Sequence, residues 1–242
     1  MNKIIIIFLI SISIAREYRD IDNLINKSQY DLALKKAISH HIVDPDDPDI
    51  HWQLARCYFE VLDQSSDKNV RKENAYKGIE FAKSAIRMNP KESQAHHWYA
   101  VLIGQIGILE GTKQKIKNSY KVRKHASYAI ELDPKYDGTL HLMGRWHYEI
   151  ANLSTAERVI ASIIYAKPPN GTFEESISFF KDAINAKPDE IRHHLWHAKA
   201  LLKLKDTENA ISSLNNALGL ESYDKSGDML QEEAKSILDD LE

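Results

Sequence analysis

One short phrase recurs three times along the chain and restricts its fold more than any other feature. Each copy is an Ala-Ile pair, three further residues and a proline, at residues 85–90, 129–134 and 183–188. Proline has no backbone N–H and keeps the residue before it out of the helical region, so a helix that reaches the phrase must end there. The three copies therefore predict three helices that end in the same way, which is typical of a helical repeat.

The residues around each phrase indicate the type of repeat. Each proline is preceded by an alanine five positions earlier and by a small or aromatic residue eight positions earlier: Ala82, Ala126 and Phe180. This is the second-helix pattern of a tetratricopeptide unit. A fourth unit without the proline keeps the spacing with Ala210, Leu214 and Ala217, and residues 29–38 resemble an earlier, incomplete one. First helices are indicated by large-small pairs that let two helices approach closely. These pairs are Leu54-Ala55, Met143-Gly144 and His197-Ala198.

The spacing of the prolines indicates enlarged units. Pro90 and Pro134 are 44 residues apart and Pro134 and Pro188 are 54 apart, against a usual period of about 34. We therefore expect insertions between the two helices of these units. Two capping boxes, at residues 154–157 and 172–175, predict a separate helix within the third insertion. An apolar stripe near the C-terminus is suited to closing a solenoid. Its members are Leu230, Ala234, Ile237, Leu238 and Leu241.

The predicted fold is therefore all-α. Residues 16–242 are expected to form a right-handed helical-repeat solenoid of tetratricopeptide-like units, with inserted helices and a C-terminal capping helix. Residues 1–15 stand apart as an apolar segment that starts with a charge at Lys3 and ends in the small-x-small triplet 13–15. They fit a secretory signal or a membrane anchor, and equally a segment buried against the repeats.

Composition and motifs argue against catalysis and against several kinds of ligand. The 242 residues carry a net charge of −3, which gives no general attraction to nucleic acid, and the single cysteine, Cys57, excludes a disulfide framework. We find no nucleophile elbow, dinucleotide fingerprint or well-spaced phosphate loop. His193 and His197 have the one-turn spacing of a zinc protease, but His194 stands where such enzymes need glutamate. His51, His97 and His194 fall at about the same place in three first helices, which favours a packing role. We expect no enzyme activity, no cofactor and no metal.

A lysine-rich segment, residues 113–125, is the first candidate for binding a partner, and it contains no acidic residue. In a helix its lysines fall on one side, opposite Ile116, Tyr120 and the buried alanines. Like charges so placed repel each other, and an acidic partner would relieve that repulsion. The plain alternative is a solvated helix face. The lysines of this predicted stripe are Lys113, Lys117, Lys121 and Lys124.

The first helices supply a second candidate, because in such a superhelix they line the concave surface. When four first helices are aligned on the small residue of the pair, three of the four residues at the next aligned position are basic, Arg56, Arg145 and Lys199, and the fourth is Leu102. Trp52 and Trp98 stand one turn earlier on the same face. Cations beside flat apolar side chains predict a groove for an acidic peptide or an anionic lipid headgroup. A structural role for these residues is the alternative.

Several segments together resemble the regulator of microtubule dynamics family. They are residues 115–120 with His125 and 129–134, residues 141–149, residues 153–158, and the Lys-Pro-Pro and Thr-Phe-Glu-Glu stretches within 167–175. The resemblance covers about residues 50–220, and part of it lies in the insertion that ordinary tetratricopeptide repeats lack.

The resemblance implies a microtubule-associated protein of the cytoplasm that acts at spindle microtubules and spindle poles in chromosome segregation. It also implies an alternative, because a membrane-anchored relative tethers the endoplasmic reticulum to mitochondria and carries phospholipid in its repeat domain. In that case residues 1–15 would place the chain at the endoplasmic reticulum or the mitochondrial outer membrane. Tubulin or another acidic protein surface and an anionic phospholipid are thus the expected partners.

Overall fold

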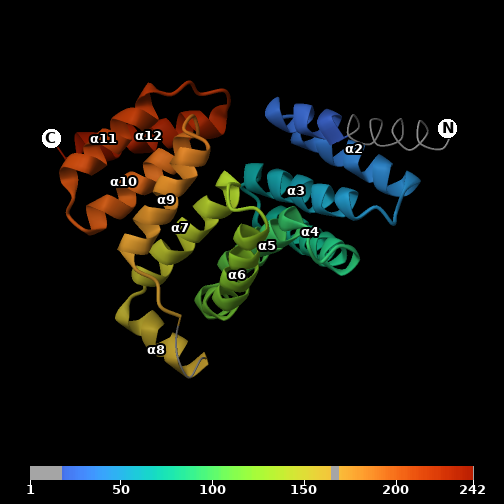
Figure 1. Cartoon of the computed structure of the whole chain (residues 1–242), viewed down its shortest axis with the longest axis horizontal. Coiled ribbons are helices and arrows are strands. Elements are labelled where there is room, and N and C mark those ends of the chain that lie inside the picture. Colours follow the sequence, from blue (N-terminus) through green and yellow to red (C-terminus); the bar gives the residue numbers. More distant parts are fainter. Residues whose placement is uncertain (1–17, 165–168, 242) are drawn as a thin grey trace. The chain divides into compact units, whose positions relative to one another are not determined.

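The structure, a computed structural model, describes residues 18–164 and 169–241, and all regular secondary structure in these ranges is helical (Figure 1). The predicted N-terminal segment, residues 1–15, lies outside the described residues. The predicted repeat region divides into two compact units, with the boundary between Leu109 and Glu110. The all-α helical-repeat prediction is confirmed.

The first unit consists of a helical segment at residues 18–26 followed by α2 (Tyr30–Val43), α3 (Pro48–Gln64), α4 (Lys68–Met88) and α5 (Ser93–Glu110). Helix α3 packs along α2 on one side and along α4 on the other. Cys57 of α3 is fully buried, and burial raises the pKa of its thiol to about 12, so it packs as a small core hydrophobe. It shares the core with Ile21, Ile25, Ala33, Ala37, Ile50 and Leu54.

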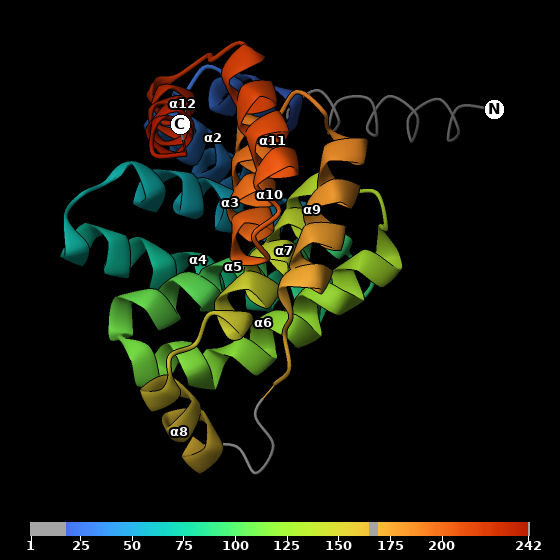
Figure 2. The same ribbon diagram turned by 90° about the vertical axis from the view of Figure 1, so that its left-hand side faces the viewer.

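The second unit contains α6 (Thr112–Leu132), α7 (Asp137–Ala151), α8 (Thr155–Ile164), α9 (Phe173–Ala186), α10 (Ile191–Lys203), α11 (Thr207–Gly219) and α12 (Lys225–Asp239). Helix α9 packs on α7 and α10, and α10 packs on α11 (Figure 2). The C-terminal apolar stripe packs against α10 and α11 as predicted, with Ala234 fully buried and the other members partly buried. Gln231 of α12 also donates hydrogen bonds to the carbonyl oxygens of Ala217 and Leu220, and so satisfies the open end of α11.

The recurrent phrases end helices as expected. Helices α4, α6 and α9 stop at Met88, Leu132 and Ala186, each two residues before the proline of its phrase. The two capping boxes are also confirmed. Glu157 accepts hydrogen bonds from the backbone N–H of Ser154 at 2.9 Å, and Thr172 accepts from the N–H of Glu175 at 3.1 Å.

The enlarged spacing of the prolines has two different causes. Between Pro134 and Pro188 the extra residues form an inserted helix, α8, as predicted. Between Pro90 and Pro134 the prediction of an insertion is wrong. Helices α5 and α6 are 18 and 21 residues long and are joined by Gly111 alone, whose φ of 97° is a backbone conformation that glycine adopts without steric cost. That unit is long because its helices are long.

Three histidines hold the turns that precede the first helices. His51, His96 and His194 each contact the carbonyl oxygen of the proline six residues earlier, at Nε2–O distances of 2.8, 3.1 and 2.8 Å. A carbonyl oxygen can only accept, so Nε2–H must be the donor in all three. The shared packing role is confirmed for His51 and His194. In the middle repeat the equivalent residue is His96, not the predicted His97, because the turn sets the count from Pro90.

Candidate partner-binding surfaces

The predicted lysine stripe lies on α6, on the side away from the helix's buried residues. Lys113, Lys117, Lys121 and Lys124 are all exposed, and at 3.6 residues per turn they fall within an arc of about 80°. The buried residues of α6 occupy the other side of the helix. They are Ile116, Asn118, Ser119, Val122, Ala126 and Ala129.

The charge of the stripe is only weakly compensated within the chain. Across the part of the chain that the structure describes, no carboxylate forms an ion pair with Lys113, Lys121 or Lys124. Lys115, two residues from Lys113, behaves differently: it turns inward and pairs with Glu149 of α7 at 2.7 Å. Three cations of the stripe thus lack a counter-ion among the described residues, which is the condition under which an external acidic surface binds most favourably.

Tyr120 differs from its predicted place. Its side chain is 37% exposed, and its helical angle puts it beside the stripe instead of opposite it. The buried side of α6 is instead anchored by Trp146 of α7, whose indole N–H donates to the carbonyl oxygen of Ser119 at 2.9 Å. The stripe therefore has an aromatic neighbour that the sequence prediction assigned to the core.

The predicted groove residues are divided between the two units and are largely neutralised. In the first unit, Arg56 pairs with Asp22 at 2.5 Å. Trp52 donates its indole N–H to Asp49 at 3.2 Å, and Trp98 is buried against Phe59. In the first unit, the charge of the predicted groove is thus neutralised by an internal ion pair, and its two tryptophans make contacts within the unit.

In the second unit, Arg145 and Lys199 meet over a residue that the predicted groove omitted, Trp196. The guanidinium carbon of Arg145 lies 3.6 Å from the Trp196 ring centroid and the Lys199 ammonium lies 4.1 Å from it. Tyr148 contacts Trp196 edge-on at 5.4 Å, and the ammonium of Lys203 lies 5.8 Å from the centre of the Tyr148 ring. We call these five residues the Trp196 cluster. The one-turn spacing of Trp196 and Lys199 is the sequence signal that could have identified it.

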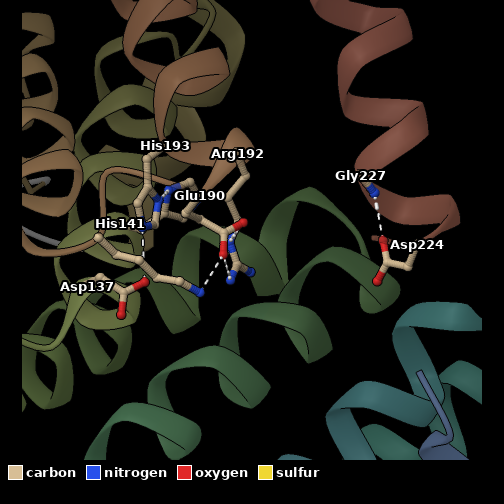
Figure 3. A network of polar contacts seen from close by, with 8 residues as sticks. Asp137, His141, Glu190, Arg192, His193, Asp224 and Gly227 are labelled. Carbon is tan, nitrogen blue, oxygen red and sulfur yellow. Dashed lines mark hydrogen bonds and ion pairs between the residues drawn. The ribbon is translucent and has the colours of Figure 1, made fainter. Parts of the chain in front are cut away.

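A buried polar network near the start of α10 is the strongest candidate for catalysis, and its geometry favours a structural role (Figure 3). His193 is fully buried, with Nε2 3.0 Å from a carboxylate oxygen of Asp137 and Nδ1 3.0 Å from Nδ1 of His141. The carboxylate can only accept, so His193 donates through Nε2–H and accepts at Nδ1 from His141. These hydrogen bonds link α10 to α7. Because solvent does not reach His193, the network offers no open site for a substrate.

Burial and hydrogen bonding both act on the pKa values in this network. Burial lowers the pKa of His193, and the hydrogen bond to Asp137 opposes that shift without cancelling it. Burial alone would raise the pKa of Asp137, but the hydrogen bond from His193 and the neighbouring positive charges, including those of Lys187 and Arg192, together outweigh burial and lower that pKa. His197 contacts Ser213 instead, at 2.9 Å, so the two histidines of the protease-like spacing have separate partners. Within residues 18–164 and 169–241, no three His, Cys, Asp or Glu side chains are placed to hold a metal ion.

Comparison with known proteins assigns the chain to a family. The family described as Regulator of microtubule dynamics protein 1-3 matches residues 18–242. The chain belongs to this family. It is 34% identical over 197 residues to regulator of microtubule dynamics protein 1 of Bos taurus, covering 81% of this chain and 62% of that relative. To regulator of microtubule dynamics protein 2 of Homo sapiens it is 29% identical, covering 81% of this chain and 48% of that relative. The chain thus spans about three-fifths or less of these family members' lengths.

Solved structures agree with the repeat fold. A thermophilic TPR protein of Thermus thermophilus superposes with a TM-score of 0.67 at 14% identity, covering 92% of this chain and 98% of that chain. The pilF protein of Pseudomonas aeruginosa gives a TM-score of 0.56 at 10% identity, with 93% and 84% covered. At such low identity the likeness to these structures shows the fold alone. Among the described helices, none has the length and apolar character needed to cross a bilayer.

Proposed function

We propose that this chain is a non-catalytic microtubule-associated protein that binds an acidic tubulin surface through the lysine stripe of α6, at spindle microtubules and poles during chromosome segregation. Its family consists of proteins named as regulators of microtubule dynamics. The observation that carries the proposal is the exposed row of Lys113, Lys121 and Lys124, which has no carboxylate partner in the described part of the chain.

The physical basis of this binding is electrostatic. Lys113 and Lys124 are eleven residues apart, so the stripe extends about 16 Å along α6. Like charges one helical turn apart repel each other, and bound acidic groups would replace that repulsion with attraction. Opposite charges on partner surfaces also speed encounter and set its orientation. Binding of this kind weakens as dissolved ions screen the charges.

We expect the chain to co-sediment with microtubules and its affinity to fall several-fold as the ionic strength rises from about 0.05 M to about 0.2 M, because exposed lysines are screened over that range. The measurement is the pelleted fraction against polymer concentration at each salt concentration. Affinity that stays constant with salt would contradict binding through the stripe.

An anionic phospholipid is the competing ligand, because its headgroup carries the same sign of charge as the acidic protein surface. In that alternative the chain is a membrane-contact tether or a phospholipid-binding module between the endoplasmic reticulum and mitochondria. Vesicles with and without anionic lipid separate the two ligands in vitro. In cells, full-length protein is compared with a version lacking residues 1–15. Spindle location of both versions supports the microtubule proposal, whereas a membrane location that truncation abolishes supports the tether.

A further inference from the structure

The Trp196 cluster in the second unit gathers several cations around two aromatic rings. Arg145 and Lys199 come from α7 and α10, and both lie over the ring of Trp196 at 3.6 and 4.1 Å. Lys203 lies one turn further along α10, and its ammonium is near the ring of Tyr148. Cations held against aromatic rings are fixed in place by packing, so they are ordered before a ligand arrives.

The carboxylates near the cluster do not balance its charge. Glu149 approaches Lys115 at 2.7 Å and Arg145 only at 3.7 Å, so it serves two cations at once. Glu233 of α12 pairs with Lys199 at 2.6 Å. Lys203 is exposed and has no ion pair with any residue in the described ranges. Two carboxylates thus face four cations, which leaves a local excess of positive charge.

We propose that the Trp196 cluster binds an extended acidic segment of a partner protein, whose carboxylates at alternate residues contact Lys199 and Lys203. These two lysines are one helical turn apart, about 6 Å. Alternate side chains of an extended chain are spaced by about 6.6 Å, which matches that separation. An acidic protein segment fits better than a lipid, because Arg145 and Lys199 cover aromatic surface that acyl chains would need.

Glu233 shows how such a carboxylate is accommodated, and it also competes with it. Its side chain comes from the capping helix α12, is 46% exposed, and occupies the Lys199 ammonium at 2.6 Å. A partner carboxylate must therefore displace it from Lys199. The capping helix thus sets the affinity of the site, and its own acidic residue lowers that affinity.

The test is fluorescence anisotropy of a labelled peptide of alternating glutamate and serine, titrated with the full chain. A peptide in which every glutamate is replaced by glutamine is the uncharged probe. Lys203→Gln is expected to weaken binding of the glutamate peptide about two- to fivefold, as for a partly exposed ion pair. Glu233→Gln is expected to strengthen it by a similar factor. The matched controls are Lys235→Gln and Glu232→Gln, which change the same charges at exposed positions of α12. Both should bind as the native chain does, and the helical circular dichroism of all variants should be unchanged.

Three results would overturn the proposal. The first is equal affinity for the glutamate and glutamine peptides. The second is an equal loss in Lys203→Gln and Lys235→Gln, which would show a general charge effect. The third is Lys203-dependent binding to vesicles of anionic lipid without any peptide binding, which would assign the cluster to a membrane. The Trp196 cluster shares no residue with the α6 stripe, so this test is independent of microtubule binding.

Discussion

Replacing Phe180 by alanine is expected to lower the free energy of unfolding by about 3–5 kcal/mol, the usual cost of removing a fully buried aromatic ring. Phe180 of α9 has no solvent exposure and packs directly on Gly144 of α7. A Cβ at position 144 would lie 2.7 Å from two carbons of the Phe180 ring, closer than side-chain carbons approach. Gly144→Ala is therefore also destabilising, by about 1–3 kcal/mol, although alanine favours helix formation.

These two residues form one contact, and their substitutions should not be additive. Phe180→Leu replaces the ring by a smaller side chain and makes room for the methyl group of Ala at position 144. The double variant Gly144→Ala, Phe180→Leu should therefore lose less unfolding free energy than the sum of the losses in the two single variants. Urea unfolding followed by circular dichroism measures the native chain, Phe180→Ala, Gly144→Ala, Phe180→Leu and the double variant. Gly219→Ala is the matched control, because a Cβ there meets no atom within 4 Å. If Gly144→Ala is as harmless as Gly219→Ala, the close packing of α7 on α9 is wrong.

Acidification from pH 7.5 to pH 4.5 is expected to destabilise the second unit, with a contribution of about 2–3 kcal/mol from His197 alone. Burial lowers the pKa of His197 from 6.5 to about 4. Below pH 6.5 the unfolded chain therefore binds a proton that the folded chain does not yet bind, so stability is lost as the pH falls through 6.5 and continues to fall until about pH 4. Burial is also the largest cause of the lowered pKa values of His147 and His193, which act in the same direction.

The measurement is the free energy of unfolding in urea at several pH values between 7.5 and 4.5. His197→Gln keeps a polar group facing Ser213 and removes the titration, so its stability should fall less steeply with decreasing pH than that of the native chain. Identical pH profiles for the two proteins would contradict the burial of a neutral His197.

Much of the fold follows from local chemistry that is visible in the sequence. Proline sets the ends of α4, α6 and α9, and the capping boxes at Ser154 and Thr172 start α8 and α9, because these residues act on their own backbone within a few positions. The lengths of α5 and α6 are harder to predict from the sequence. The sequence between Pro90 and Pro134 is compatible with an inserted segment or with two long helices, and the structure shows two helices of 18 and 21 residues.

The binding surfaces show a similar division. The arc of the α6 lysines depends only on helical geometry and could be predicted. The ion pairing of Arg56 and Lys199 depends instead on carboxylates from other helices. Those carboxylates, Asp22 and Glu233, are each 34 residues from their partners, which is close to the repeat period of about 34. A search for opposite charges at that separation would have found both pairs. The position of Trp196 between two cations could not be read from one helix, because Arg145 belongs to α7.

Microtubule binding through the α6 stripe is tested most directly by co-sedimentation of a charge-reversed variant. In that variant Lys113, Lys117, Lys121 and Lys124 are all changed to glutamate. The control reverses Lys135, Lys181, Lys225 and Lys235, which are exposed lysines of the same unit, and so produces the same net charge. If the stripe binds microtubules, affinity for them falls about tenfold or more in the stripe variant and stays near the native value in the control. Equal pelleting of the two variants would contradict this prediction.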